Sequence, residues 1–414
     1  MIDWQKKINR RFPKLSVQIA YWCFYVAVIM EVAIVVVDKS DWINPIEGRL
    51  FQLTFLLFLT KFLLTKYTRR EYVIIFLFGA VGLISYLITD RNEILRVVMF
   101  IAACKDVDMR KCLKMVLWLT FLGCITLILL SVTGVYGNAV LSQDFGRGGI
   151  ETRYVLGMGH PNALQCMIWA LTTLYLYLCG KKMIWYQYLL ILAVNLGFFI
   201  LTDSKTGFLA AVFVIVMVFC MTQFDKRERQ KLLQTGMLVM IAVTVFSIGF
   251  SVLIAQKAYT VYNHDWYETS DSETMFFVRL NDALTGRIRT LTGTERWEGT
   301  ISTWSLFSSP QNNYFFDMGW IRLFYWYGII PGIIFVIVLF TLLIYFYKKR
   351  DYMSIALISA ISLYNIVEAH VISVYLARNY LFFLIGAVWC GVAESLTCRK
   401  EGKCKERKDG SWND

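Results

Sequence analysis

Long apolar segments follow one another along almost the whole chain and are separated by short polar stretches. Residues 232–256 and 323–347, for example, contain no charged side chain. A helix needs about 20 apolar residues to cross about 30 Å of hydrocarbon, and an α-helix satisfies its own backbone hydrogen bonds there. The pattern therefore predicts an all-α polytopic membrane protein.

The lengths of these segments predict twelve transmembrane helices. They are expected at residues 19–37, 50–64, 72–89, 93–104, 113–133, 163–179, 184–201, 207–222, 232–255, 323–347, 352–373 and 381–396. The fourth segment is short and carries Glu93 and Arg96, so a re-entrant or broken helix is the alternative there. Without this span, every later loop would lie on the opposite side of the membrane.

The distribution of Lys and Arg predicts the orientation, because these residues collect in short cytoplasmic loops. With the N-terminus in the cytoplasm, most of the 42 Lys and Arg residues lie inside, together with both termini. No small-residue cleavage site follows the first apolar run, so this run is expected to stay as the first span. Residues 1–396 then form one membrane domain with outer loops at about 134–162 and 256–322, and residues 397–414 form a basic cytoplasmic tail.

Composition narrows the class of function. The net charge of +12 is spread over many loops rather than gathered on one soluble module, which argues against nucleic-acid binding. All ten cysteines fall in predicted spans or on the cytoplasmic side, so no disulfide framework is expected in the outer loops. The long outer loop, 256–322, is too rich in aromatic residues for a disordered tether and is expected to fold over the membrane mouth.

Polar residues cluster where the first outer loop enters the span at 163–179. Arg153 is followed by His160, Pro161 and Asn162. Ionisable groups at a bilayer mouth need partners and indicate a functional site, although a helix entry with a snorkelling arginine and a satisfied histidine is the structural alternative. A second polar turn, 202–207, includes Ser204 and Lys205, and a simple helix N-cap would also explain it.

The long outer loop carries further candidates. Residues 279–289 include Arg279, Asn281 and Arg287. Leu280, Ala283, Leu284 and Arg287 are spaced along one helical face, and a solvated amphipathic helix with Arg279 paired to Asp282 is the alternative. The loop then ends in a turn-like stretch ahead of an aromatic, glycine-containing span. This stretch holds Asn312, Asn313 and Tyr314.

The eleventh predicted span contains ionisable residues. Together with Asn365, Glu368 and His370 lie in it at helical spacing, with Arg378 and Asn379 just beyond. Intramembrane ionisable residues face a bundle interior or a wet cavity. An internal Glu–Arg or Glu–His pair is therefore the alternative to a catalytic role.

Taken in order, these motifs resemble those of the Wzy-type polysaccharide polymerases, particularly the capsular polymerases of Gram-positive bacteria, in the superfamily that includes O-antigen ligases. The resemblance covers about residues 140–380. It rests on the Arg…Gly-x-x-His-Pro-Asn entry at 153–162, the Thr-x-Ser-[Arg/Lys]-x-Gly turn at 202–207, the Leu-Asn-x-x-Leu-[Ser/Thr]-Gly-Arg-Ile stretch at 280–288, the Asn-x-Tyr motif at 312–314, and Glu368 with Asn379.

Two positions depart from the family pattern. Lys205 stands where Arg is usual, which keeps the charge but loses the bidentate fork for phosphate. Gln311 stands where the family pattern has Asp before Asn-x-Tyr. The resemblance therefore does not supply a carboxylate at that place.

The resemblance implies a glycosyltransferase in the bacterial cytoplasmic membrane. Such polymerases release a growing glycan from undecaprenyl pyrophosphate on the outer face and join it to a sugar hydroxyl of the next lipid-linked oligosaccharide. No cofactor and no metal are expected, and the expected partners besides this substrate are membrane lipids, a flippase and a chain-length regulator.

Roles for the candidate residues follow from this chemistry. Arginine's donors match phosphate oxygens, so pyrophosphate binding is expected from the outer cations Arg153, Lys205, Arg279 and Arg287. Of the three histidines, His160, His264 and His370, only His160 lies in the resembling motif and is the expected base, with Glu368 as the competitor. The remaining substrate-binding residues are expected to be Asn162, Ser204, Asn281, Asn312, Asn313, Tyr314 and Arg378.

Other classes of protein share this pattern. A flippase or transporter of lipid-linked sugars would show the same spans, but with inverted repeats or a central path of basic residues. An O-antigen ligase or a peptidoglycan glycosyltransferase of related fold would share chemistry and layout. A non-catalytic membrane assembly partner is the fourth alternative.

Overall fold

Helices make up most of the computed structural model, which describes residues 13–145, 149–262, 272–293, 296–370 and 375–401. His264 and most of the predicted basic tail lie outside these ranges. The α-helices are α2 (Pro13–Asp38), α3 (Glu47–Leu64), α4 (Arg69–Thr89), α5 (Glu93–Ala103), α6 (Met109–Val132), α7 (Pro161–Cys179), α8 (Trp185–Thr202), α9 (Lys205–Lys226), α10 (Gln230–Tyr262), α11 (Ser272–Ala283), α12 (Arg287–Thr290), α13 (Gly319–Tyr327), α14 (Ile329–Lys349), α15 (Tyr352–Tyr364) and α16 (Tyr380–Glu401). Short 3-10 turns occur at η1 (Gly180–Lys182), η2 (Ile301–Thr303) and η3 (Leu376–Arg378).

Eight helices of the described chain are long and apolar enough to cross a membrane. These are α2, α4, α6, α7, α8, α9, α10 and α14. The all-α polytopic membrane class is thereby confirmed. Two shorter apolar helices lie at Tyr352–Tyr364 and Tyr380–Gly391, and α5, the expected fourth span, has only 11 residues. The number of twelve spans stays a prediction.

Two predicted spans differ from the observed helices. The apolar segment 323–347 is divided at Gly328, whose φ of +94° is unsuited to helix and separates α13 from α14. The segment 352–373 leaves the helix after Tyr364. The Oδ1 of Asn365 accepts the N–H of His370 at 3.1 Å, and its carbonyl accepts the N–H of Trp320 at 3.3 Å. Polar side-chain and backbone contacts thus replace helical hydrogen bonds there.

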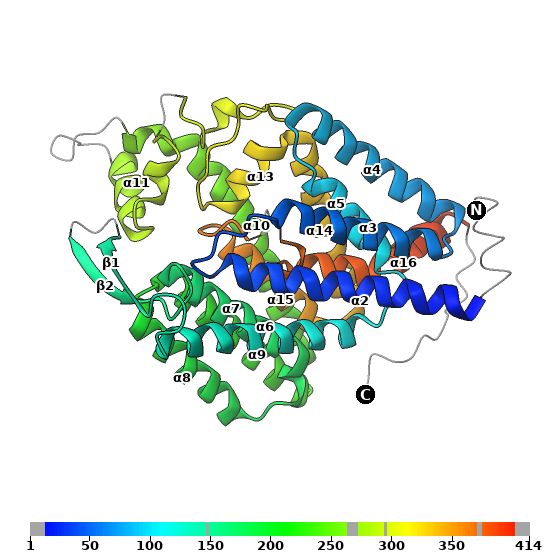
Figure 1. Ribbon diagram of the computed structural model, residues 1–414, viewed down its shortest axis with the longest axis horizontal. Coiled ribbons are helices and arrows are strands. Elements are labelled where there is room, and N and C mark those ends of the chain that lie inside the picture. Colours follow the sequence, from blue (N-terminus) through cyan, green and yellow to red (C-terminus); the bar gives the residue numbers. More distant parts are fainter. Residues whose placement is uncertain (1–12, 146–148, 263–271, 294–295, 371–374, 402–414) are drawn as a thin grey trace.

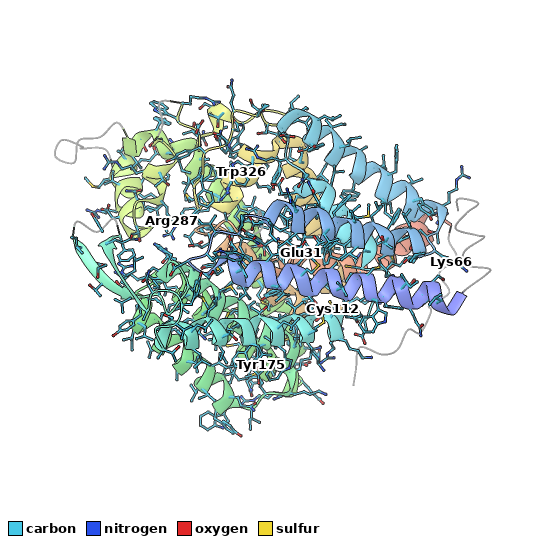
Figure 2. The ribbon with its side chains drawn as sticks, in the orientation of Figure 1. Glu31, Lys66, Cys112, Tyr175, Arg287 and Trp326 are labelled. Atoms are coloured by element: carbon cyan, nitrogen blue, oxygen red, sulfur yellow. The ribbon has the colours of Figure 1, made fainter. Side chains whose placement is uncertain are left out.

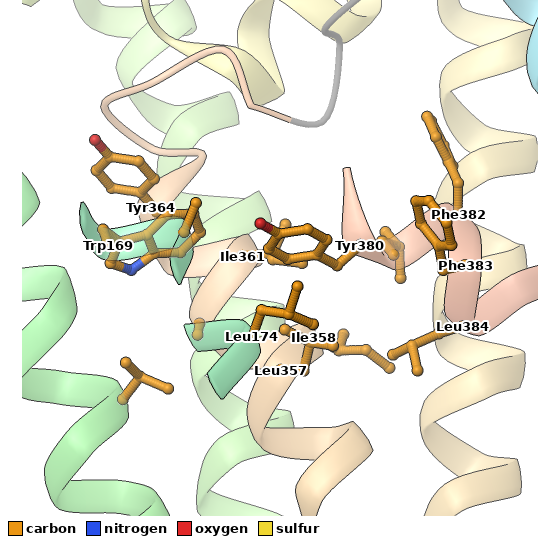
Figure 3. Close-up of a cluster of buried hydrophobic side chains, with 14 of the residues drawn as sticks. Trp169, Leu174, Leu357, Ile358, Ile361, Tyr364, Tyr380, Phe382, Phe383 and Leu384 are labelled. Carbon is orange, nitrogen blue, oxygen red and sulfur yellow. The ribbon is translucent and has the colours of Figure 1, made fainter. Parts of the chain in front are cut away.

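The core of the bundle lies around α15, in which every residue except Leu363 is buried. This helix packs against α7, α9, α10, α14 and α16. Figure 3 shows Trp169 of α7 beside Tyr364 of α15, with ring centroids 4.3 Å apart, and Tyr380 and Phe383 of α16 in the same apolar cluster. The turn that follows α15 is therefore anchored on the buried core of the bundle.

Loop elements gather at one end of the bundle. Strands β1 (Val140–Asp144) and β2 (Ile150–Tyr154) form an antiparallel hairpin in which Leu141 pairs with Arg153. The hairpin and α11 lie at the same end of the long axis (Figure 1). Arg287 lies toward this end, whereas Lys66 lies at the opposite end (Figure 2). The described part of the long loop is folded, since Phe277, Ile288 and other residues of it are buried in the core.

Replacing Gly328 by Ala tests the break between α13 and α14. A Cβ there would lie 2.5 Å from the Ser308 nitrogen and 2.6 Å from the Leu306 carbonyl oxygen, in a left-handed conformation. We expect Gly328→Ala to lower the free energy of unfolding by about 2 kcal/mol. Gly79→Ala on α4 is the matched control, because nothing lies within 4 Å of a Cβ there. Thermal unfolding in detergent measures both, and equal midpoints would contradict the expectation.

Candidate functional site

An ion pair between Arg287 and Glu368 forms the centre of the candidate site. The Nη2 of Arg287 lies 3.0 Å from the Oε1 of Glu368, and the two side chains are only 10% and 13% exposed. Arg287 opens the short helix α12 after Gly286, whose φ is +77°. The Oδ1 of Asn281 accepts the N–H of Arg289 at 2.9 Å and so holds α12 against the end of α11. Asn281 thereby positions Arg287.

Glu368 lies in the turn beyond α15 and is tightly surrounded. Gly319 packs against this turn so closely that a Cβ would lie 2.7 Å from the Glu368 carbonyl oxygen. Burial, together with the nearby charge of Asp317, raises the pKa of Glu368 to about 7, although Arg287 and Arg378 act in the opposite direction. A carboxyl group with this pKa exchanges its proton near neutral pH, as a general base requires.

His160 lies within the electrostatic range of the same groups. Burial lowers its pKa; Asp317 opposes this shift, while Arg153 and Arg287 add to it. Its Nδ1 accepts the backbone N–H of Asn162 at 3.1 Å and caps α7. A neutral imidazole that accepts at Nδ1 carries its proton on Nε2. The Nε2 of a neutral His160 is therefore a hydrogen-bond donor in this arrangement.

Arg153 is buried rather than snorkelling. Its guanidinium forms ion pairs with Glu151 and with Asp203, the latter at 3.6 Å, and lies 4.2 Å from the ring centroid of Phe145. Arg153 thus ties the hairpin to the turn between α8 and α9. In that turn Ser204 is buried and makes no capping hydrogen bond, while Lys205 is exposed.

A second arginine approaches Glu368 from η3. The Nη2 of Arg378 lies 3.1 Å from the Sγ of Cys166 on α7, and its charge acts on Glu368. Of the internal pairs considered for Glu368, the described ion pair is with Arg287 and not with Arg378 or His370. His370 is fully buried with its ring edge-on to Trp169, 5.0 Å between centroids. His370 is therefore not a member of the Arg287–Glu368 pair.

Several other predicted residues lie away from this cluster or hold the loop together. Arg279 on α11 and Asn313 are exposed. Asn312 is buried, and its Nδ2 donates to the Tyr325 carbonyl at 3.0 Å and to Ser308 Oγ at 3.2 Å. The N–H of Tyr314 donates to Tyr325 Oη at 3.3 Å. These contacts organise the loop, and roles in substrate binding stay predictions for these residues.

Asp317 is the site residue that the sequence motifs missed. It lies within electrostatic range of both His160 and Glu368. The family pattern directed attention to a carboxylate at position 311, where this chain has Gln. The signal that would have found Asp317 is its position two residues before Gly319, whose lack of a side chain permits the close approach to Glu368.

Comparison with known protein families, with curated proteins and with solved structures finds no match to this chain. Among the described residues, no three His, Cys, Asp or Glu side chains are grouped so that they could hold a metal ion. The site combines one carboxylate with a raised pKa, two nearby arginines, a second carboxylate and a capping histidine.

A mutant cycle on Arg287 and Glu368 measures how strongly the pair couples. We expect Arg287→Gln to lower the free energy of unfolding by about 3 kcal/mol, because it leaves a buried carboxylate without its partner. The double variant Arg287→Gln/Glu368→Gln is expected to recover part of this loss. Arg279→Gln, an exposed control, is expected to change stability by less than about 0.5 kcal/mol. Additive effects in thermal unfolding would show that the two groups do not interact.

Proposed function

We propose that this protein is a glycosyltransferase that polymerises undecaprenyl-pyrophosphate-linked oligosaccharides into a surface polysaccharide, at the outer face of the bacterial cytoplasmic membrane. The observation that carries the proposal is the buried Arg287–Glu368 pair, in which a carboxyl group of pKa about 7 touches a cation suited to phosphate. Both residues also belong to motifs that resemble those of the polymerase family. Arg287 lies in the stretch 280–288, and Glu368 is matched together with Asn379.

The proposed topology has twelve spans with both termini in the cytoplasm. In it α13 and α14 together take the place of the tenth span, and the short helices α5 and α15 count as crossings. The separation of Lys66 and Arg287 to opposite ends of the bundle supports this orientation (Figure 2). The hairpin, α11 and α12 then lie on the outer side, where lipid-linked oligosaccharide is available.

The reaction uses both members of the pair. The acceptor hydroxyl oxygen attacks the anomeric carbon of the donor glycan, the bond from that carbon to the pyrophosphate oxygen breaks, and the hydroxyl proton passes to Glu368. Once protonated, Glu368 no longer neutralises Arg287. The guanidinium of Arg287 then stabilises the charge that develops on the departing pyrophosphate, with Arg378 nearby.

His160 fits the role of a donor better than that of the base in this arrangement. The Nδ1 lone pair is engaged by the Asn162 N–H, so the remaining ring nitrogen carries hydrogen and suits a phosphate or sugar oxygen. Glu368 is therefore the favoured base, and His160 holds the substrate. Arg153, compensated by Glu151 and Asp203, chiefly positions the hairpin that borders the site.

A flippase for the same lipid is the second candidate. One observation favours it: Glu31 and Arg96 form a buried ion pair at 3.0 Å between α2 and α5, deeper in the bundle. Charges there would line an internal path. Glu31, however, also accepts a hydrogen bond from Thr54 at 2.6 Å and one from the Leu376 N–H at 3.4 Å. These partners satisfy the Glu31 carboxylate within the protein.

Loss of polymer in Glu368→Gln tests the proposed function. Gln keeps the shape but cannot accept the proton, so we expect long polymer to fall by about a hundredfold or more. Arg287→Lys keeps the charge but loses the bidentate guanidinium donors, so we expect it to form an intermediate amount of long polymer. Arg229→Gln, at an exposed position between α9 and α10, is the control. Polymer length on a gel, with membrane levels confirmed, is the measurement.

The site where substrate accumulates separates the two candidate functions. Single lipid-linked units on the outer face of cells carrying Glu368→Gln support a polymerase. Accumulation on the inner face would contradict it and indicate a flippase. Long polymer from both site variants would also contradict the assignment.

The pH dependence of polymerisation identifies the base. A base works only when deprotonated, so the rate is expected to fall as the pH drops below about 7, the pKa of Glu368. His160→Gln is expected to show the same fall in rate below about pH 7, from a lower maximum rate. If this fall is lost in His160→Gln, His160 is the base. Initial rates with purified protein and lipid-linked substrate measure both.

A further inference from the structure

An apolar groove runs between α4, α5, α14 and α16, apart from the Arg287–Glu368 site. Its cavity volume is about 430 Å³, and Glu93 is the only charged residue among those that line it. Val97 and Ala102 line it from α5, and Ile337 and Leu342 line it from α14. A cavity of this composition suits a long hydrocarbon chain.

The groove has the length of one membrane leaflet. From Glu93 to Ala102 the lining of α5 rises by about 14 Å at 1.5 Å per residue, roughly half of a hydrocarbon core of about 30 Å. Glu93 marks the polar end. Arg91, two residues earlier, donates to the carbonyls of Trp326 at 3.0 Å and of Asn312. This end of the groove therefore lies against the loop that leads into α13.

The groove is open to the side because α14 stands away from α4 and α5. Helix α14 packs mainly against α13 and α15. Two residues that line the groove, Phe78 of α4 and Ile337 of α14, are 36% and 58% exposed. A chain can therefore enter from the surrounding bilayer between these helices.

Cations lie at the polar end. The guanidinium of Arg322 lies 3.5 Å from the ring centroid of Trp326 and 3.9 Å from that of Phe315, and its buried Nε has no hydrogen-bond partner. Arg91 and Arg322 are both within electrostatic range of Glu93. Asp317 and Arg378 also act on Arg322, so three cations face two carboxylates and leave net positive charge where the groove ends.

We propose that this groove binds the isoprenoid chain of a lipid-linked substrate, with the lipid phosphate at Arg91 and Arg322. The inference rests on the proposed function and assigns the place of the lipid. The placement connects to the reaction through Asp317, which is in electrostatic range of both Arg322 and Glu368. A lipid head bound at Arg322 therefore shares Asp317 and Arg378 as electrostatic neighbours with Glu368.

Photolabelling tests the occupant. The probe is undecaprenyl phosphate with a diazirine in its chain, applied to the purified full-length protein, and labelled peptides are expected from α5 and α14. Ile337→Trp fills the groove and is expected to reduce labelling roughly fivefold or more, which is about 1 kcal/mol. Ile344→Trp is the matched control, since Ile344 lies on the same helix with 56% exposure and does not line the groove.

Equal labelling of the Ile337→Trp and Ile344→Trp variants overturns the groove. So does labelling by a diazirine phosphatidylglycerol that undecaprenyl phosphate fails to displace, because that result indicates ordinary bilayer lipid. The phosphate is tested with Arg91→Gln, which is expected to weaken labelling by the phosphate probe while leaving labelling by the uncharged polyprenol probe unchanged. Equal loss of both overturns the role of the cation.

Different results would contradict the polymerase function and the lipid site in the groove. If wild-type protein forms polymer and Ile337→Trp retains full labelling and full polymer formation, the proposed lipid site in the groove is overturned and the polymerase function stands. Wild-type protein that is labelled in the groove but forms no polymer from lipid-linked oligosaccharide overturns the polymerase and leaves the lipid site.

Discussion

The contact between Arg287 and Glu368 is the interaction on which the candidate site depends. It joins residues 81 positions apart in the chain, one in the segment between α10 and α13 and one beyond the core helix α15. A buried ion pair is weak evidence for stability, because the desolvation of both charges offsets their attraction. A pair that leaves its carboxyl group with a pKa of about 7 is instead well placed to exchange a proton with a substrate.

Other buried charges of the bundle carry the same desolvation cost and are also paired with opposite charges. Arg153 is compensated by two carboxylates, and Arg96 by Glu31. Glu31 also accepts the Leu376 N–H and so links α2 to η3, the turn that carries Arg378. A contact that stabilises the charge of Glu31 therefore also helps to position Arg378. This arrangement explains why polar side chains from α2 and α5 meet a backbone N–H of η3 inside an otherwise apolar core.

Glycines permit the close approaches that this arrangement needs. At Gly319 a side chain would overlap Asn365, with a Cβ 2.1 Å from its Oδ1. The start of α13 can therefore lie directly against the turn that bears Glu368. Gly328 then separates α13 from α14, so that α13 stays beside the loop while α14 continues as a long apolar helix. A single continuous helix would carry Arg322 and Asp317 elsewhere.

The sequence by itself determined the membrane class and the approximate position of eight long helices, because hydrocarbon imposes a length and an apolar composition that any stretch of chain displays locally. It also drew attention to His160, Arg287 and Glu368 through their motifs. Only the tertiary structure decided that Glu368 pairs with Arg287, that Asp317 joins them and that Asn312 organises a loop. These facts depend on contacts between distant segments and on where two glycines let backbones touch, and neither is encoded in the spacing of apolar residues.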